Sequence, residues 1–244
     1  MQELMKQFVT AINEAGLTKT VFYSFHVLAF ITVMSLALWL GTRLKISKMK
    51  SFITVMIVYP LMYLWMLVQY WVENGFKNFG GQNIVTIFIW VPVIAYIAAV
   101  ILKIEWKTMC CLVAPLITVN HAVGHLGCII AGCCRSYPVS WGLYSVGSGD
   151  YHFPIQPIES LTAFAIVFVL LKIMKKDNYV PTAKIYPINL ILFGSTRFIF
   201  EFIRDNEKIF LGCSRLSFHA LFMTLVGIVA LIIINKKNKS AKEA

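Results

Sequence analysis

Long apolar runs, separated by short polar linkers, constrain this chain more than any other feature. Seven such runs occur, and a run of roughly 20 apolar residues crosses the hydrocarbon of a bilayer as a helix. Of the 244 residues, 59% are hydrophobic, compared with roughly 45–50% in ordinary soluble domains. Only helices and closed barrels satisfy every backbone polar group inside a bilayer, and these runs are too long for barrel strands. The sequence therefore predicts an all-α integral membrane protein.

The linkers between the runs are short, so we expect one polytopic membrane domain over residues 1–244. The fourth run carries His121 and His125, and it fits either one long span or a shorter helix that breaks near Gly124. The seven expected spans cover residues 21–42, 52–72, 84–102, 108–130, 155–171, 185–203 and 216–234.

Lysine and arginine are distributed unequally between the two sets of loops. One set holds 14 of the 22 basic residues and the other holds 7, and the richer side of a membrane protein faces the cytoplasm. We therefore expect a multi-pass protein of the cell membrane, with its N-terminus outside and its C-terminus inside. The net charge of +11 then reflects topology and anionic headgroups. Because the basic residues are spread over separate loops, we expect no nucleic-acid partner.

Two segments lie outside the expected spans on the outer side. The first 20 residues fit either an amphipathic helix at the interface or a disordered tail. The extracytoplasmic loop around residues 134–154 is rich in aromatic residues and glycine. Loops of this length are usually functional or disordered, so this one fits either a cover over a site or a surface loop that aromatic side chains anchor to headgroups.

Polar side chains gather in the outer halves of three expected spans. Such residues usually face a cavity, a partner or a substrate path, because charge is costly in a membrane. Arg197, Glu201 and Arg204 are spaced four and three residues apart, which places them on one helix face. The full set of polar side chains is His121, His125, Cys128, Gln156, Glu159, Arg197, Glu201 and Arg204. The sequence predicts a polar pocket in the outer half of the bundle, the alternative being ion pairs that only hold helices together.

Two further observations concern histidine and cysteine. His26 lies in the outer half of the first span, where it fits either the pocket or a helix–helix hydrogen bond. His121, His125 and Cys128 are spaced to share a helix face, with Cys133 and Cys134 just beyond. That set suits zinc, copper or another soft-ligand metal. Disulfides or unreactive thiols are the alternative, and the disulfide state of these outer cysteines and of Cys213 stays open.

Three motifs in order resemble one known family. They are Gly124-His-Leu-Gly-Cys-Ile-Ile-Ala-Gly-Cys-Cys134, Phe153-Pro-Ile-Gln156-Pro-Ile-Glu159 and Arg197-Phe-Ile-Phe-Glu201-Phe-Ile-Arg204. On a seven-helix frame with the N-terminus outside, they resemble the signature of the prolipoprotein diacylglyceryl transferases. The resemblance implies transfer of a diacylglyceryl group from phosphatidylglycerol to a cysteine thiol of an exported protein or peptide, with glycerol phosphate released and no metal or cofactor required.

The resemblance also implies roles for single residues. The arginines on the sixth span would bind the phosphate, oriented by the two glutamates, while His125 would act as base or phosphate ligand. Gln156 would contact the headgroup. The catalytic assignments are His125, Arg197 and Glu201, and the substrate-binding assignments are His26, Gln156, Glu159 and Arg204.

The chain departs from the family pattern at several positions. His125 stands where the family has its signature arginine, and Cys128 stands where its main branch has asparagine. The family's His-Gly-Gly is absent, and the most similar stretch of the sequence is Phe79-Gly80-Gly81. Two alternatives to the transferase therefore remain: a family member that lost this activity and binds lipid or peptide, and a metal-handling membrane protein that uses the His121, His125 and cysteine cluster.

Overall fold

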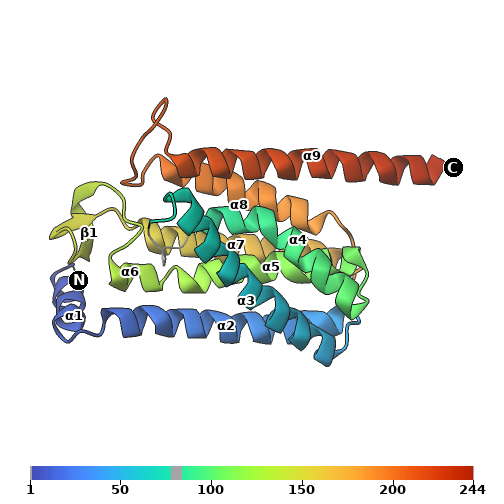
Figure 1. Cartoon of the computed structure of the whole chain (residues 1–244), viewed down its shortest axis with the longest axis horizontal. Helices are drawn as coiled ribbons and strands as arrows, with labels where there is room; N and C mark the ends of the chain where they lie inside the picture. Colours follow the sequence, from blue (N-terminus) through green and yellow to red (C-terminus); the bar gives the residue numbers. More distant parts are fainter. Residues whose placement is uncertain (1, 78–83, 244) are drawn as a thin grey trace.

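The computed structural model describes residues 2–77 and 84–243, and it is mostly helical, as the sequence predicts. The long helices run roughly side by side along one axis, and a small β-hairpin lies at the end that also holds the N-terminus (Figure 1). Phe79-Gly80-Gly81 lies outside the described residues. The elements are α1 (Gln2–Glu14), α2 (Thr18–Arg43), α3 (Lys48–Glu73), α4 (Ile84–Leu102), α5 (Trp106–Gly124), α6 (Gly127–Ala131), β1 (Pro138–Ser145), β2 (Asp150–His152), α7 (Ile155–Lys176), α8 (Ile185–Glu201) and α9 (Arg215–Glu243).

Each apolar run in the sequence corresponds to a helix. Within the described part of the chain, five helices are long and apolar enough to cross a membrane: α2, α3, α5 continued by α6, α7 and α9. Helices α4 and α8 are also apolar but shorter. The expectation of a helical membrane protein is confirmed at this level.

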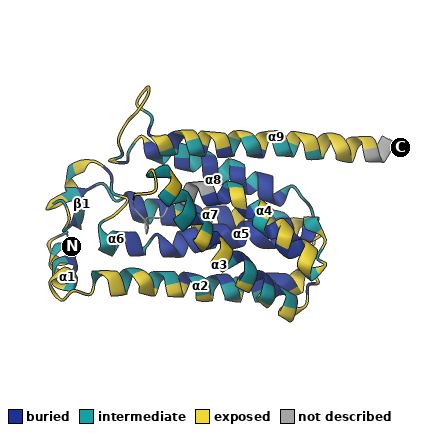
Figure 2. Ribbon diagram, viewed as in Figure 1, coloured by how far each residue is buried: buried dark blue, intermediate teal, exposed yellow. Residues whose placement is uncertain are grey.

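Helix α5 forms the centre of the bundle. In its apolar window 83% of residues are buried, compared with 17% in α2 and 22% in α9, and Figure 2 shows the same contrast between α5 and α9. The outer helices instead expose large apolar side chains such as Ile31 and Phe222. Apolar surface of this extent is typical of contact with lipid tails.

A polar contact in the middle of the bundle joins α5 to α8. The side-chain amide of Asn189 donates to the carbonyl of Ala114 (3.1 Å), and the Thr118 hydroxyl donates to Asn189 Oδ1 (2.8 Å). Interhelical hydrogen bonds of this kind fix helix register where water is absent. The contact therefore helps to set the height of α8 against α5.

Of the two readings left open for the fourth run, the structure shows the helix that breaks near Gly124. Helix α5 ends at Gly124, and the short α6 begins at Gly127 and ends before Gly132, which has a left-handed φ of 63°. A Cβ atom at Gly127 would come within 3.1 Å of the Phe22 carbonyl. Glycine at this position therefore allows α6 to approach α2 closely.

The loop around residues 134–154 contains a hairpin that the sequence did not predict. Strand β1 pairs antiparallel with β2, with Tyr144 opposite Tyr151. His152, the last residue of β2, is buried, and its Nδ1 lies 2.6 Å from the Ser136 carbonyl. The hairpin also contacts α1, where the Lys6 ammonium lies 5.3 Å from the Tyr144 ring centroid. The N-terminal segment is thus a helix and not a disordered tail.

Candidate active site

A shared carboxylate lies at the centre of the polar end of the bundle. Glu159, in the first turns of α7, accepts hydrogen bonds at Oε1 from Arg197 Nη1 (2.7 Å) and Arg204 Nε (2.9 Å). Its Oε2 accepts from Arg204 Nη2 (2.7 Å) and lies 2.8 Å from His125 Nε2. One carboxylate therefore joins α5, α7 and the end of α8.

The second carboxylate, Glu201, ends α8. It forms ion pairs with Arg197, one helical turn earlier, and with Arg204 (3.8 Å). Its Oε2 accepts from Asn206 Nδ2 (2.7 Å) and Ser214 Oγ (2.8 Å), which lie in the segment before α9. The spacing of four and three that the sequence showed thus places both arginines beside one glutamate.

These four charges balance one another in a buried place. Glu159 is 3% exposed, Glu201 0%, Arg197 5% and Arg204 3%. A buried ion-pair group stabilises a protein little compared with apolar packing of the same volume, but removing one partner leaves an uncompensated charge. An arrangement that costs desolvation and contributes little stability favours a functional role.

A cavity of about 640 Å³ opens beside this network. Arg197, Arg204 and His125 line it, facing His26 and Tyr63 from α2 and α3. The two glutamates are not among its lining residues and lie behind the arginines. Ligand pockets in proteins typically measure roughly 300–1,000 Å³, so this cavity is large enough to bind a ligand.

Three cysteines line the same cavity. Cys128, Cys133 and Cys134 are free thiols, and the sulfurs of Cys128 and Cys134 lie within 4.8 Å of a ring nitrogen of His125. Hydrogen bonds from the thiols of Cys128 and Cys133, together with the nearby Arg204 guanidinium, hold the pKa of the Cys134 thiol well below its usual value. The three thiols and the Arg204 guanidinium therefore form one polar group at the cavity wall.

The other predicted residues are placed as follows. His26 lines the cavity, and its Nδ1 lies 3.0 Å from the Phe22 carbonyl in the same helix. The Gln156 side chain donates to the Cys133 carbonyl (3.0 Å) and is not among the lining residues. His121 is buried against His125, with ring centroids 4.8 Å apart. Of the seven assigned residues, the structure thus brings all but Gln156 to the cavity or to the network behind it.

Sequence reasoning missed several polar residues at the cavity. Tyr63, Tyr70, Asn120 and Ser214 line it, and Asn120 has a buried Oδ1 with no hydrogen-bond partner in the described part of the chain. A signal for Asn120 was present, because an amide inside an apolar run is costly. Ser214 follows α8 in an irregular segment, where no periodicity marks it.

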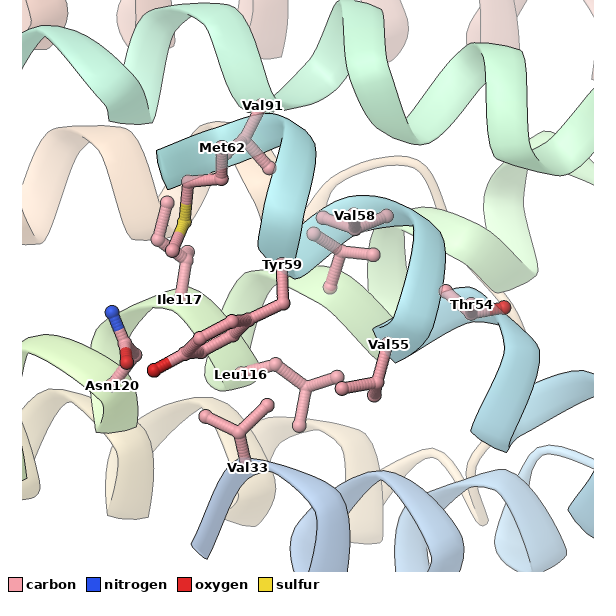
Figure 3. A pocket seen from close by; sticks show the side chains of 11 residues that line it. Val33, Thr54, Val55, Val58, Tyr59, Met62, Val91, Leu116, Ile117 and Asn120 are labelled. Atoms are coloured by element: carbon pink, nitrogen blue, oxygen red, sulfur yellow. The ribbon is translucent and has the colours of Figure 1, made fainter. Parts of the chain in front are cut away.

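A second cavity lies deeper between α2, α3 and α5. Figure 3 shows the Tyr59 ring crossing it, with its hydroxyl directed toward Asn120. Valine, leucine and methionine side chains form most of its wall, and its volume is about 30 Å³. A cavity of this size holds at most a few water molecules, so it is far smaller than a ligand pocket.

Comparison with known proteins decides the family. The family model for prolipoprotein diacylglyceryl transferase matches residues 19–233. The chain belongs to this family. The resemblance read from the three motifs is therefore confirmed.

Two curated members of the prolipoprotein diacylglyceryl transferase family are similar to the chain. The phosphatidylglycerol–prolipoprotein diacylglyceryl transferase of Clostridium tetani (strain Massachusetts / E88) is 28% identical over 125 residues, covering 48% of this chain and 49% of that protein. The phosphatidylglycerol–prolipoprotein diacylglyceryl transferase 2 of Clostridium perfringens (strain 13 / Type A) is 26% identical over 149 residues, covering 57% of each. The chain thus matches about half of the length of these relatives.

Proposed function

We propose that this protein transfers the diacylglyceryl group of phosphatidylglycerol to the cysteine thiol of an exported precursor protein or peptide. The observation that carries the proposal is the pair of buried arginines, Arg197 and Arg204, on the wall of the 640 Å³ cavity. The family membership and the printed names of the two clostridial relatives support the same reaction.

The arginines suit the phosphodiester of the lipid. A guanidinium presents a planar fork of donors that matches phosphate oxygens, and it stabilises charge that develops on the leaving phosphate. Glu159 and Glu201 position both guanidinium groups from behind. In this assignment Arg197 and Arg204 bind the headgroup phosphate, and Gln156 acts through the Cys133 carbonyl that it contacts.

The acceptor side needs a thiolate, because the thiol itself is a poor nucleophile. His125 has its Nε2 within hydrogen-bond distance of Glu159, which orients the imidazole at the cavity wall. The acceptor thiol loses its proton to solvent, and its sulfur then attacks the glyceryl carbon that carries the phosphate ester. A C–S bond forms, the C–O bond breaks, and glycerol phosphate leaves with the electron pair. His26, across the cavity, contacts the incoming lipid or peptide.

The proposal includes an orientation. Seven helices, α2 to α5 and α7 to α9, cross the bacterial plasma membrane with the N-terminus outside, as a single domain over residues 1–244. Support comes from the excess of lysine and arginine in loops at the end opposite the polar network. The cavity, α1 and the β-hairpin then lie toward the outer leaflet, where exported acceptors arrive.

Rescue of a bacterium depleted of its own transferase tests this function, together with formation of a lipid-modified cysteine peptide by the purified protein. We expect the wild type to succeed and Arg197→Ala to fail in both assays. Arg135→Ala is the matched control, because this half-exposed arginine pairs with Asp205 at the same end and is not among the cavity-lining residues.

Failure of the wild type in both assays would contradict the transferase and favour a family member that only binds lipid or peptide. Full activity of Arg197→Ala would contradict the assignment of the site.

A further inference from the structure

We propose that His125, Cys128 and Cys134 bind a divalent zinc-type metal ion, whose remaining coordination position takes the acceptor thiol. The metal site stands on the cluster alone, whereas the role of the thiol rests on the proposed function. The three residues come from the end of α5, from α6 and from the segment that follows it.

The geometry of the donors carries the proposal. The ring nitrogen and the two sulfurs lie within 4.8 Å of one another. A tetrahedral zinc ion with bonds of about 2.0–2.3 Å places its donors roughly 3.5 Å apart. Side-chain rotations that move each donor atom by about an ångström therefore bring the three donors to ligating distance. Imidazole and thiolate are the donors that zinc prefers, and the cysteines are not used in disulfides.

His125 is oriented for this role. Its Nε2 lies 2.8 Å from the Glu159 carboxylate and 3.2 Å from Arg204 Nη2, and the proposal assigns the other ring nitrogen, Nδ1, to the metal. A carboxylate that receives the other N–H of a ligating histidine is the common outer shell of zinc sites, because it fixes the ring and its tautomer. An arginine at this position would have no lone pair to donate, so histidine at 125 is what makes a metal ligand available.

Charge selects this donor set over a neighbouring one. His121, His125 and Glu159 also lie within 4.8 Å of one another, but Glu159 already accepts hydrogen bonds from two arginines. A dication held by two thiolates and a neutral imidazole adds no net charge to a network in which two arginines balance two glutamates. The sulfur-containing set is therefore the one that this end of the bundle accommodates.

The position of the set gives the ion a chemical task. All three ligands line the large cavity, and three protein ligands with one open position are the pattern of catalytic zinc. A thiol that coordinates zinc is deprotonated outright. The acceptor proton passes to solvent, the bound sulfur attacks the glyceryl carbon, and the electron pair of the broken C–O bond leaves on glycerol phosphate. No oxidation state changes.

Metal binding is tested on the purified full-length protein without any lipid. We expect about one equivalent of Zn²⁺ after dialysis, and thiolate-to-metal charge-transfer absorption when Co²⁺ replaces it. Cys128→Ser and Cys134→Ser should each lose the bound metal and the absorption, whereas Cys213→Ser, at a cysteine that is not among the cavity-lining residues, should keep both. Wild-type protein without stoichiometric metal, or serine variants that bind as wild type does, would overturn the site.

The thiol position is tested with the Co²⁺-loaded protein. A short peptide that contains cysteine should increase the charge-transfer absorption, and the same peptide with serine should not. Identical spectra with the two peptides would overturn the open position. Neither readout depends on turnover, so a protein that binds Co²⁺ and the thiol but forms no lipid-modified product would refute the transferase and leave the metal site standing.

Discussion

At one end of α5, Cys110 and Cys111 pack among apolar side chains, whereas at the other end His121 and His125 meet charged residues from α7 and α8. Both ends are buried. At the apolar end Cys111 contacts Thr182 in two ways: its thiol donates to the Thr182 carbonyl (3.3 Å), and the Thr182 N–H donates to its sulfur (3.4 Å). The difference teaches that burial alone does not mark a site: the informative feature is buried polar groups that exceed what packing requires.

The largest expected effect comes from removing the shared carboxylate. Glu159→Ala leaves two buried arginines short of a partner, and we expect a loss of about 3–5 kcal/mol in the free energy of unfolding. Denaturant titration in detergent measures it. Glu105→Ala, at the start of α5 in an exposed pair with Lys107, is the control and should change stability little. Equal losses of stability in Glu159→Ala and Glu105→Ala would contradict the comparison between the two ends of α5.

A conservative change at Arg197 should affect activity more than folding. Lysine keeps the charge, but it lacks the fork that reaches both Glu159 and Glu201 and a phosphate. Loss of one such donor costs about 10²–10³ in rate, which product formation from labelled phosphatidylglycerol measures. Arg135→Lys should retain wild-type rates, and unchanged activity in Arg197→Lys would remove this arginine from the site.

The two groups of cysteines should respond oppositely to serine. Cys110→Ser places a hydroxyl among apolar neighbours, and we expect about 1–3 kcal/mol of destabilisation with metal content unchanged. Cys134→Ser, at the cavity, should lose metal, and its change in the free energy of unfolding should be smaller when both proteins are measured free of metal. Metal analysis and denaturant titration of the same preparations test both predictions. A reversed pattern would mean that the cavity cysteines are structural.

The smallest expected effect comes from the Asn189 contact, which meets α5 between its two ends. Asn189→Ala removes the bonds to Ala114 and Thr118, and interhelical bonds in membranes average about 0.6 kcal/mol. Thr32→Ala, which loses only a bond to its own helix, is the control. Loss of transferase activity in Asn189→Ala without a loss of stability would show that the register of α8 matters to the site.

The sequence predicted the helices because the apolar runs are long and separate, and it predicted the face shared by Arg197, Glu201 and Arg204 because their spacing is local. It did not predict that Glu159 joins both arginines, since that depends on how α7 packs against α8. The hairpin escaped prediction because glycine and tyrosine in an outer loop are equally typical of irregular structure. The convergence of His125 with Cys134 depends on the turn at Gly132, which no helical spacing reveals.

The position of Glu159 between Arg197 and Arg204 has a consequence for affinity. A phosphodiester headgroup carries one negative charge and must compete with this carboxylate for the same donors, so the intact lipid gains only part of the attraction. The phosphate monoester that leaves carries about −1.5 to −2 at neutral pH and competes more strongly. Under the proposed reaction the arginines therefore interact more strongly with the phosphate as charge develops on it in the transition state, which is the differential binding that accelerates a chemical step.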